Sequence, residues 1–133
     1  MKPFSSRVTR GLQHGSIVTA CDNSGAKMVN IISVKCHKTV KGRVPACGVG
    51  DMVSCSVVKG KPEVRKKVFY AIIVRQRMPF RRADGTHIKF EDNAAVVLKD
   101  EDGNPKGTMM KGALPKEVVE RWPAVGKLAR VIV

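Results

Sequence analysis

The chain has 133 residues, enough for one domain whose apolar core forms without disulfides or a metal. Hydrophobic residues make up 43% and charged residues 27%, a balance typical of a globular protein. The unusual property is the net charge of +14, because 25 Lys and Arg stand against 11 Asp and Glu. Such an excess repels itself in a compact fold unless a polyanion neutralises it, which favours a nucleic-acid partner.

An anionic membrane surface is the second polyanion to consider. No apolar run approaches the roughly 20 residues of a membrane-spanning helix. Residues 1–10 lack the apolar stretch of a secretory signal, and no basic amphipathic helix with a broad apolar face is present. We therefore expect a cytoplasmic protein without a membrane partner. The alternative is a basic protein whose charged faces are in contact with water and bind no polyanion.

Apolar and polar residues alternate through the first part of the chain, in the two-residue period of β-strands. The strands expected there lie at residues 16–21, 26–35 and 51–58. A turn at Asp22–Gly25 joins the first two, because its last residue is free to adopt a positive φ. The apolar residues expected to share one face of the second strand are Met28, Ile32 and Val34. Residues 36–50, rich in Gly, Lys and Pro, are expected to form a loop.

An uninterrupted apolar run, Val68–Val74, occupies the centre of a strand expected over residues 66–76. Lys59–Pro62 ends the strand before it, because proline has no backbone donor. Asp84-Gly85 is a strong signal for a two-residue hairpin turn. The arms of that hairpin are expected at residues 78–83 and 86–91. The next elements are a strand at 94–99 and an acidic turn at 100–105.

The last quarter of the chain predicts short helices. Pro115 fits the first turn of a helix, with Glu117 near the positive end of the helix dipole. Pro123 ends this helix, a further helical turn follows, and Val131–Val133 is expected to be a buried end. Strands at short spacing with few helices indicate a small closed β-barrel, because closure removes exposed edges. We expect one domain over residues 1–133, with the barrel at about 12–100 and the C-terminal loop and helices at about 105–133.

No catalytic or metal site has a complete set of residues. The cysteines form no CxxC pair and complete no zinc spacing with the histidines, so free thiols are expected at Cys21, Cys36, Cys47 and Cys55. Gly48–Gly50 fails as a nucleotide-binding loop, and Asp100–Gly103 lacks the Glu that closes a calcium loop. A carboxylate pair among Asp22, Glu91 and Asp92 is explained equally well by turns. We expect no cofactor, no metal and no enzymatic activity.

Positive charge is concentrated between residues 35 and 82, where 13 basic residues stand against two acids, Asp51 and Glu63. Neutralised phosphates release counterions, which favours binding and makes it salt-dependent. Aromatic residues are only 5% of the chain, so recognition of folded RNA through backbone and shape is favoured over base stacking. The residues expected to bind RNA are Lys35, Lys38, Lys41, Arg43, Lys59, Lys61, Arg65, Lys66, Lys67, Arg75, Arg77, Arg81 and Arg82. Of these, Arg81 and Arg82 lie just before the predicted hairpin turn and are expected to contact the RNA backbone.

A spaced signature begins at Ala71. It reads Ala71-Ile72-Ile73-Val74, nine residues, Asp84-Gly85, four residues, Phe90, two residues, Asn93, two residues, Val96-Val97. This pattern resembles the signature of the universal ribosomal protein L14 family, and the turn Cys21–Ala26 resembles that family's turn. Similarity to the archaeal and eukaryotic branch, called L23 in eukaryotes, comes from Gly50–Val53, Lys59–Val68 and Trp122–Val125. The resemblance extends from about Leu12 to Val133.

The resemblance implies a five-stranded β-barrel, a projecting β-ribbon that includes Lys59–Lys67, and short C-terminal helices. It implies a structural role in the large ribosomal subunit, with binding to large-subunit rRNA and bridges to small-subunit rRNA. The implied protein partners are ribosomal proteins L3 and L24e and an anti-association initiation factor. The residues expected at the partner or subunit interface are Asp22, Asn23, Ser24, Lys116, Glu120 and Arg121. From the residues alone, a free nucleic-acid-binding barrel acting as a chaperone and a small enzyme remain rival classes.

Overall fold

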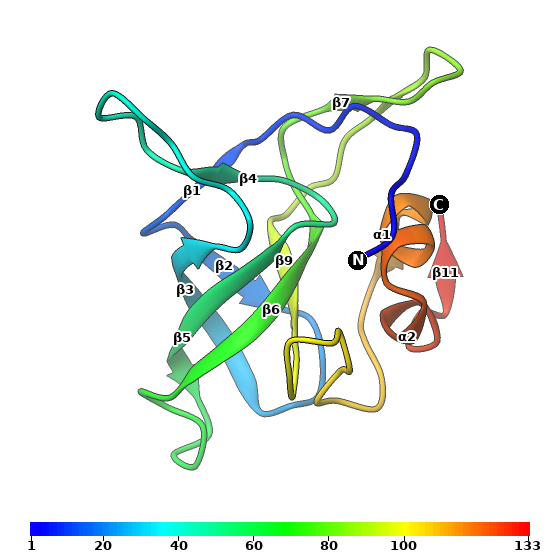
Figure 1. The fold of residues 1–133 in the computed structure, drawn as a ribbon. Coiled ribbons are helices and arrows are strands. Elements are labelled where there is room, and N and C mark those ends of the chain that lie inside the picture. Colours follow the sequence, from blue (N-terminus) through cyan, green and yellow to red (C-terminus); the bar gives the residue numbers. More distant parts are fainter.

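A computed structural model describes residues 1–133, and its centre is a closed five-stranded barrel (Figure 1). Neighbouring strands pair antiparallel except where β2 and β9 close the barrel in parallel, with Thr19 opposite Ala94. The barrel strands, in order around it, are β2 (Ile17–Ala20), β3 (Ala26–Val34), β5 (Met52–Gly60), β6 (Val68–Arg75) and β9 (Ala94–Val97). The predicted closed barrel and its strands are therefore confirmed.

Strand β6 is buried on both faces and separates two apolar cores. Ala71 and Ile73 point into the inner core, which fills the barrel, whereas Ile72 and Val74 point into the outer core beneath the C-terminal segment. All four side chains are fully buried. A strand covered on both faces has no need of polar residues in alternation, which explains the uninterrupted apolar run.

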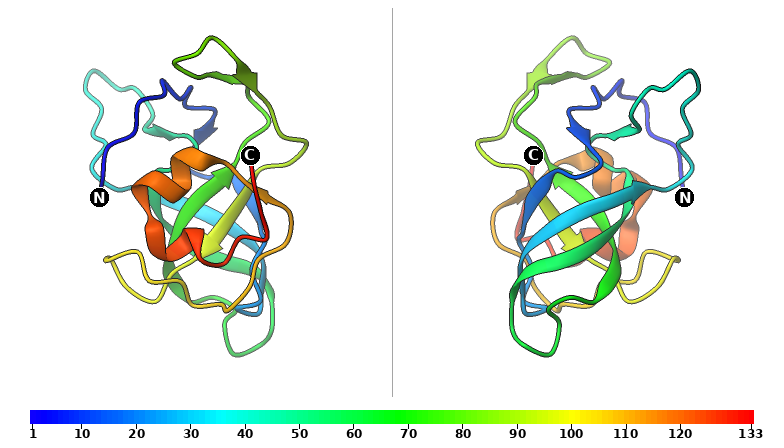
Figure 2. Two further views of the ribbon diagram at one scale, coloured as in Figure 1. Left: turned by 90° about the vertical axis from the view of Figure 1, so that its right-hand side faces the viewer. Right: turned by 90° about the vertical axis from the view of Figure 1, so that its left-hand side faces the viewer.

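The elements outside the barrel lie at its ends and over its β6–β9 side (Figure 2). Two short helices cover that side, where Trp122 donates from Nε1 to the carbonyl oxygen of Gly50 at 2.9 Å. Neither helix has the length and apolar character needed to span a bilayer. The remaining elements are β1 (Leu12–Gln13), β4 (Ala46–Cys47), β7 (Phe80–Arg81), β8 (His87–Ile88), β10 (Ala113–Leu114), α1 (Lys116–Arg121), α2 (Pro123–Gly126) and β11 (Val131–Ile132).

The predicted face of β3 is wrong. Ile32 is 46% exposed, and the side chains that enter the inner core are Ala26, Val29, Ile31 and Val34. The register against β5 shifts three times along β3. Each such bulge adds a residue that has no partner and moves the side chains that follow to the opposite face. Simple two-residue alternation therefore could not identify the buried side of this strand.

Three predicted connections also differ from the structure. The expected loop at residues 36–50 contains β4, which pairs antiparallel with β1. The hairpin turn has three residues, not two: Arg82 and Thr86 hydrogen-bond across it, and Gly85 adopts φ +90°. The lysine-rich arm is strand only at Lys59 and Gly60, and the projecting two-stranded ribbon is β7–β8 (Figure 1).

The C-terminal end is exposed instead of buried. Val131, Ile132 and Val133 are about half exposed, although β11 pairs in parallel with β10. The helical predictions fare better, because α1 starts directly after Pro115 and ends before Pro123, which begins α2. The apolar C-terminal residues therefore pair with one neighbouring strand, but no other element covers their side chains.

Ile73 is buried on β6 and Ile32 is exposed on β3, so the same substitution should affect the stability of the protein very differently at the two positions. Replacing the fully buried Ile73 with Ala should lower the free energy of unfolding by about 2–5 kcal/mol, because it leaves a cavity in the inner core. The same change at the exposed Ile32 should alter it by no more than about 0.5 kcal/mol. Urea unfolding followed by circular dichroism measures both, and equal losses would contradict the assigned β3 register.

Candidate nucleic-acid interface

A groove of about 1000 Å³ lies between the N-terminal segment and the β7–β8 ribbon. Most of its lining is polar or charged, and no acidic side chain belongs to it. Its basic and titratable lining residues are Arg7, Arg10, Arg81, Arg82 and His87. We call this feature the basic groove. Its shape and charge suit an extended polyanion.

Two arginines that line this groove lie directly opposite each other on paired backbone segments. Arg7 and Arg81 form an antiparallel β-bridge, and both side chains are exposed. Like charges placed directly opposite one another destabilise a strand pair. An anion bound to both guanidinium groups would turn this repulsion into attraction, and phosphate suits their bidentate geometry.

A buried glutamine holds the N-terminal segment in place beside the ribbon. Gln76 is fully buried, and its Nε2 donates to the carbonyl oxygens of Thr9 at 2.9 Å and Met78 at 3.0 Å. Its Oε1 accepts from the backbone N–H of Val49 at 3.1 Å. The end of β6 therefore fixes both walls of the basic groove relative to the barrel.

The loop between β3 and β4 extends the positive surface from the basic groove. Arg10 Nη1 lies 3.5 Å from His37 Nε2, which joins this loop to the N-terminal segment. Lys38, Lys41 and Arg43 are exposed on the loop. Lys41 has φ +58°, a left-handed conformation that costs a residue other than glycine about 1–2 kcal/mol.

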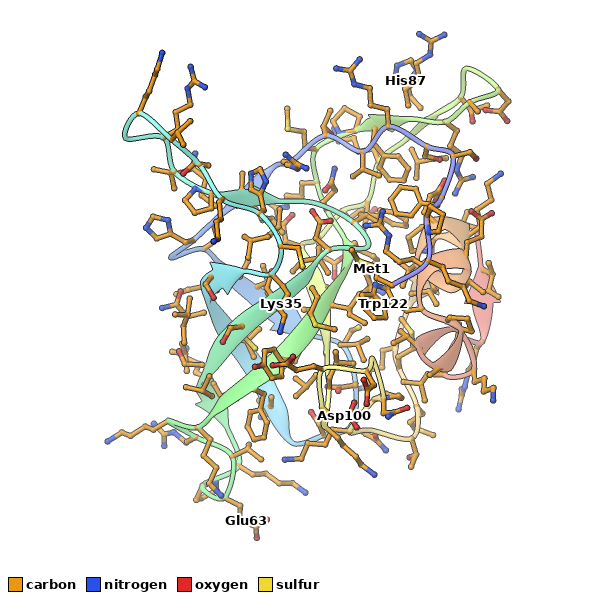
Figure 3. All side chains as sticks on the ribbon, in the orientation of Figure 1. Met1, Lys35, Glu63, His87, Asp100 and Trp122 are labelled. Carbon is orange, nitrogen blue, oxygen red and sulfur yellow. The ribbon has the colours of Figure 1, made fainter.

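Five other basic residues predicted to bind RNA lie at the opposite end of the barrel (Figure 3). His87 and Glu63 mark the two ends in that view. All members of this second cluster are exposed, and Lys66 has φ +61°. We call it the distal tip; it comprises Lys59, Lys61, Arg65, Lys66 and Lys67. The basic residues concentrated between residues 35 and 82 of the sequence thus include a cluster at each end of the barrel.

Arg75, which the sequence predicts to bind RNA, is largely buried and has several partners within the protein. Its side chain is 9% exposed and holds Asp92 through two hydrogen bonds, at 2.9 and 3.1 Å. It also donates to the carbonyl oxygens of Lys111 and Ala113, both at 3.0 Å. Gly112, between those carbonyls, has no room for a side chain because a Cβ would lie 2.5 Å from the guanidinium. Arg75 therefore fastens the C-terminal segment to the barrel.

Arg82 is likewise committed inside the protein, although its residue borders the basic groove. It binds both carboxylate oxygens of Glu117, at 2.7 and 3.2 Å, and the carbonyl oxygen of Val133 at 2.7 Å. Ser6 donates to the same carboxylate at 2.8 Å. Burial alone raises the pKa of Glu117, but the hydrogen bonds from Arg82 and Ser6 outweigh it and leave the pKa below its ordinary value. This network ties the ribbon, α1 and both chain ends together.

Two further predicted RNA ligands lie outside both clusters. Lys35 is paired with Glu101 at 2.6 Å and lies over the ring of Tyr70. Arg77 is exposed, and its Nε donates to the carbonyl oxygen of Glu91 at 2.9 Å. Both retain exposed surface, but each already has a partner within the chain.

The residues predicted at a partner interface form two groups. In the Asp22–Gly25 turn, Asn23 binds the side chain and the backbone N–H of Thr108, both at 2.8 Å, while Asp22 accepts from the N–H of Val97 at 3.1 Å. On α1, Lys116 and Glu120 are exposed one turn apart. Arg121 is half-buried, 3.3 Å from Asp51 and stacked on Phe4. Of this set, Asn23, Lys116 and Glu120 have the exposed side chains that docking requires.

Three of the four cysteines belong to the cores. Cys47 and Cys55 lie in the inner core, and burial raises the pKa of each thiol to about 12. Burial also raises the pKa of Cys21, in the outer core, to about 11. These thiols stay protonated at neutral pH and act as small apolar side chains. Cys36 is exposed on the β3–β4 connection.

Sequence reasoning missed three residues of the basic groove: Arg7, Arg10 and His87. The N-terminal segment has no regular hydrophobic period, so its position could not be derived from its own residues. Its two arginines within four positions were the only available signal. They become part of the groove because Gln76 holds the N-terminal segment opposite the ribbon.

The Glu117 network predicts a pH-dependent contribution to stability. The Glu117→Gln variant should lose about 3–5 kcal/mol at pH 7, because Arg82 keeps its charge while losing its buried partner. The folded pKa of Glu117 is lowered, so its contribution is present above the unfolded pKa of about 4.3 and is lost as the pH falls through the folded pKa. The stability gap between wild type and variant should therefore narrow on acidification.

Urea unfolding at a series of pH values between about 7 and 3 measures this gap. Glu120→Gln, an exposed change on the same helix, is the matched control and should show no gap at any pH. A Glu117→Gln gap that stayed constant across the series would contradict the ion pair as its source.

Comparison with known proteins gives a consistent result over the whole chain. The family model described as "Ribosomal protein L14p/L23e" matches residues 11–133. A protein of Picrophilus torridus named "Large ribosomal subunit protein uL14" is 53% identical over 133 residues, covering all of both chains. Proteins with the same name from Nanoarchaeum equitans and Sulfurisphaera tokodaii are 49% and 53% identical; the first match covers both chains fully, the second 95% of this chain and 91% of the relative. The chain therefore belongs to the ribosomal protein L14p/L23e family.

Proposed function

We propose that this protein is a structural constituent of the large ribosomal subunit in the cytoplasm and binds large-subunit rRNA through the basic groove. Membership of its family makes it a structural protein and not an enzyme. The observation that carries the RNA contact is the exposed pair Arg7 and Arg81, bridged backbone to backbone in a groove lined by no acidic side chain. An RNA phosphate chain supplies the negative charge that this arrangement lacks.

The charge balance supports the same contact. Only four ion pairs form within the chain, although it has 25 Lys and Arg. About half of the unpaired remainder lies in the basic groove, the adjoining β3–β4 loop and the distal tip. We propose that the basic groove and the distal tip bind separate rRNA segments, so that the barrel acts as a spacer between them.

The proposed neighbours are ribosomal proteins L3 and L24e, with small-subunit rRNA across the subunit interface and an anti-association initiation factor as further partners. The surface best suited to these contacts combines the Asn23 turn with the exposed Lys116 and Glu120 of α1. The side chains of Lys116 and Glu120 are exposed without an ion-pair partner, whereas Asn23 is held by Thr108 and the C-terminal segment by the Arg75 and Arg82 networks. A rigid base with exposed charged side chains favours a specific contact over a diffuse one.

A free RNA-binding chaperone is the second candidate function, because the same charge would serve it. Sedimentation of cell extracts separates the two. The proposed structural role places the chain in the large-subunit fractions after a moderate salt wash, whereas a chaperone remains in the unbound fraction.

Removing one groove arginine tests the RNA contact. The Arg81→Ala variant should bind large-subunit rRNA more weakly, and its slope of log K against log salt should fall by about 0.7–0.9 for the one lost phosphate contact. With Arg7→Ala added, the fall should double. Filter binding over a range of KCl concentrations measures the slope.

An arginine outside the groove serves as the control. Arg130→Ala, an exposed change, should leave the slope unchanged. Arg82→Ala, which breaks the internal ion pair, should lower the free energy of unfolding. An unchanged slope in the Arg7→Ala/Arg81→Ala variant would show that the groove is only solvated.

A further inference from the structure

The N-terminal wall of the basic groove, residues 5–10, belongs to no helix or strand and runs beside the β7–β8 ribbon (Figure 1). Apart from the bridge between Arg7 and Arg81, no backbone-to-backbone hydrogen bond outside the helices and strands joins this segment to the rest of the protein. Its position therefore depends on contacts made by side chains. Those contacts decide whether Arg7 lies where a phosphate can reach it.

Gln76 makes the buried contact that holds the segment. Its Nε2 donates to Thr9 at two atoms, the carbonyl oxygen at 2.9 Å and Oγ1 at 3.2 Å. The same nitrogen donates to the carbonyl oxygen of Met78, and Oε1 accepts from the N–H of Val49. Both polar atoms of this fully buried side chain thus have partners. Water cannot replace these bonds without opening the site, so their loss leaves buried groups unsatisfied.

Gly48 lies directly against this contact and leaves the room that it needs. A Cβ at this position would lie 2.6 Å from the carbonyl oxygen of Thr9 and 2.9 Å from Oε1 of Gln76. Real Cβ atoms do not come so close to other heavy atoms, so a side chain here would push the two residues apart. The N–H of Gly48 is itself held by Asp51 at 2.9 Å, which limits how far its own backbone can shift. Gly48, in the stretch that fails as a nucleotide-binding loop, therefore has a packing role.

The other side chains at this end of the segment make weaker contacts. Thr9 Oγ1 donates to the carbonyl oxygen of Pro79, and Arg10 approaches His37, but both contacts are exposed to water, which competes with them. Val8 packs on the outer core and is only half-buried. The hydrogen bonds of the buried amide are therefore the strongest hold on this part of the segment.

Arg7 lies between two anchors. On one side, Ser6 is hydrogen-bonded to α1 at 2.8 Å, and on the other, Gln76 holds Thr9. Loss of the second anchor releases the backbone at Arg7, because the bridge to Arg81 places like charges opposite each other and does not favour the docked position.

We propose that Gln76 is a positioning residue for RNA binding, which acts through Arg7 and does not itself touch the ligand. The proposal rests on the proposed function and deepens it, because it makes the affinity of the groove depend on a buried amide. Arg81 does not depend on this amide in the same way. It is held by the pairing of β7 with β8 and by the anchored Arg82 beside it.

A double-mutant cycle tests the coupling between Gln76 and Arg7. In the wild-type background, Arg7→Ala should lower the slope of log K against log salt for large-subunit rRNA by about 0.7–0.9. Gln76→Met, which keeps a side chain of similar length without the amide, should lower it by the same amount. Adding Arg7→Ala to Gln76→Met should cause no further fall, whereas adding Arg81→Ala should still cause one. Filter binding over a range of KCl concentrations measures all five variants.

The possible outcomes separate this proposal from the proposed function. Additive falls for Gln76→Met and Arg7→Ala, or an unchanged slope in Gln76→Met, would overturn the positioning role while leaving the RNA contact in place. If neither Arg7→Ala nor Arg81→Ala changes the slope in the wild-type background, the RNA contact fails and the positioning role falls with it.

Limited digestion by trypsin gives a second readout that needs no RNA. Cleavage after Arg7 should accelerate at least fivefold in Gln76→Met, because the segment is released, and an unaltered rate would contradict the proposal. Gly48→Ala should show the same acceleration and the same loss of the Arg7 contribution with Gln76 in place, and it carries the test if Gln76→Met does not fold. Ile73→Val, a change within the inner core, controls for general destabilisation and should alter neither the cleavage rate nor the slope.

Discussion

The burial of β6 on both of its faces is the constraint on which the rest of the structure depends. Its alternate side chains fill two different cores, so the strand is stable only if the barrel closes on one side and the C-terminal segment packs on the other. Each core alone would leave about half of the apolar run in water, a loss of several kcal/mol. Closure of the barrel and docking of the helices are therefore linked through a single strand.

The ends of β6 convert this packing into the placement of charge. Arg75 and Gln76 follow the apolar run directly and are buried, and each satisfies several backbone groups of segments distant in sequence. Arg75 holds the C-terminal segment, whereas Gln76 holds the N-terminal one. Both side chains already have partners within the protein. The positive charge available to a ligand therefore comes from the loops at the barrel ends.

Two carboxylates are committed to ion pairs within the fold, whereas most of the bases remain exposed. Glu117 and Asp92 neutralise the two arginines that stabilise the tertiary structure. The residues left without partners, among them Arg7 and Arg81 at one end and the distal tip at the other, cannot lower their mutual repulsion within the chain. Folding thus produces a molecule with basic clusters at both ends of the barrel and one wall covered by its own helices.

The local periodicity of the sequence determined the barrel strands. The backbone preferences of glycine and proline determined the Gly25 turn and the ends of the short helices. The composition determined an excess of positive charge suited to RNA. Only the tertiary structure decided which charges are free: Arg75 and Arg82 meet carboxylates 17 and 35 residues away, and Arg7 meets Arg81 across most of the barrel sequence. It also decided which face of β3 is buried, because bulges change the direction of side chains without altering their pattern. Pairings between distant segments follow from the closure of the whole chain, and no local pattern of residues encodes them.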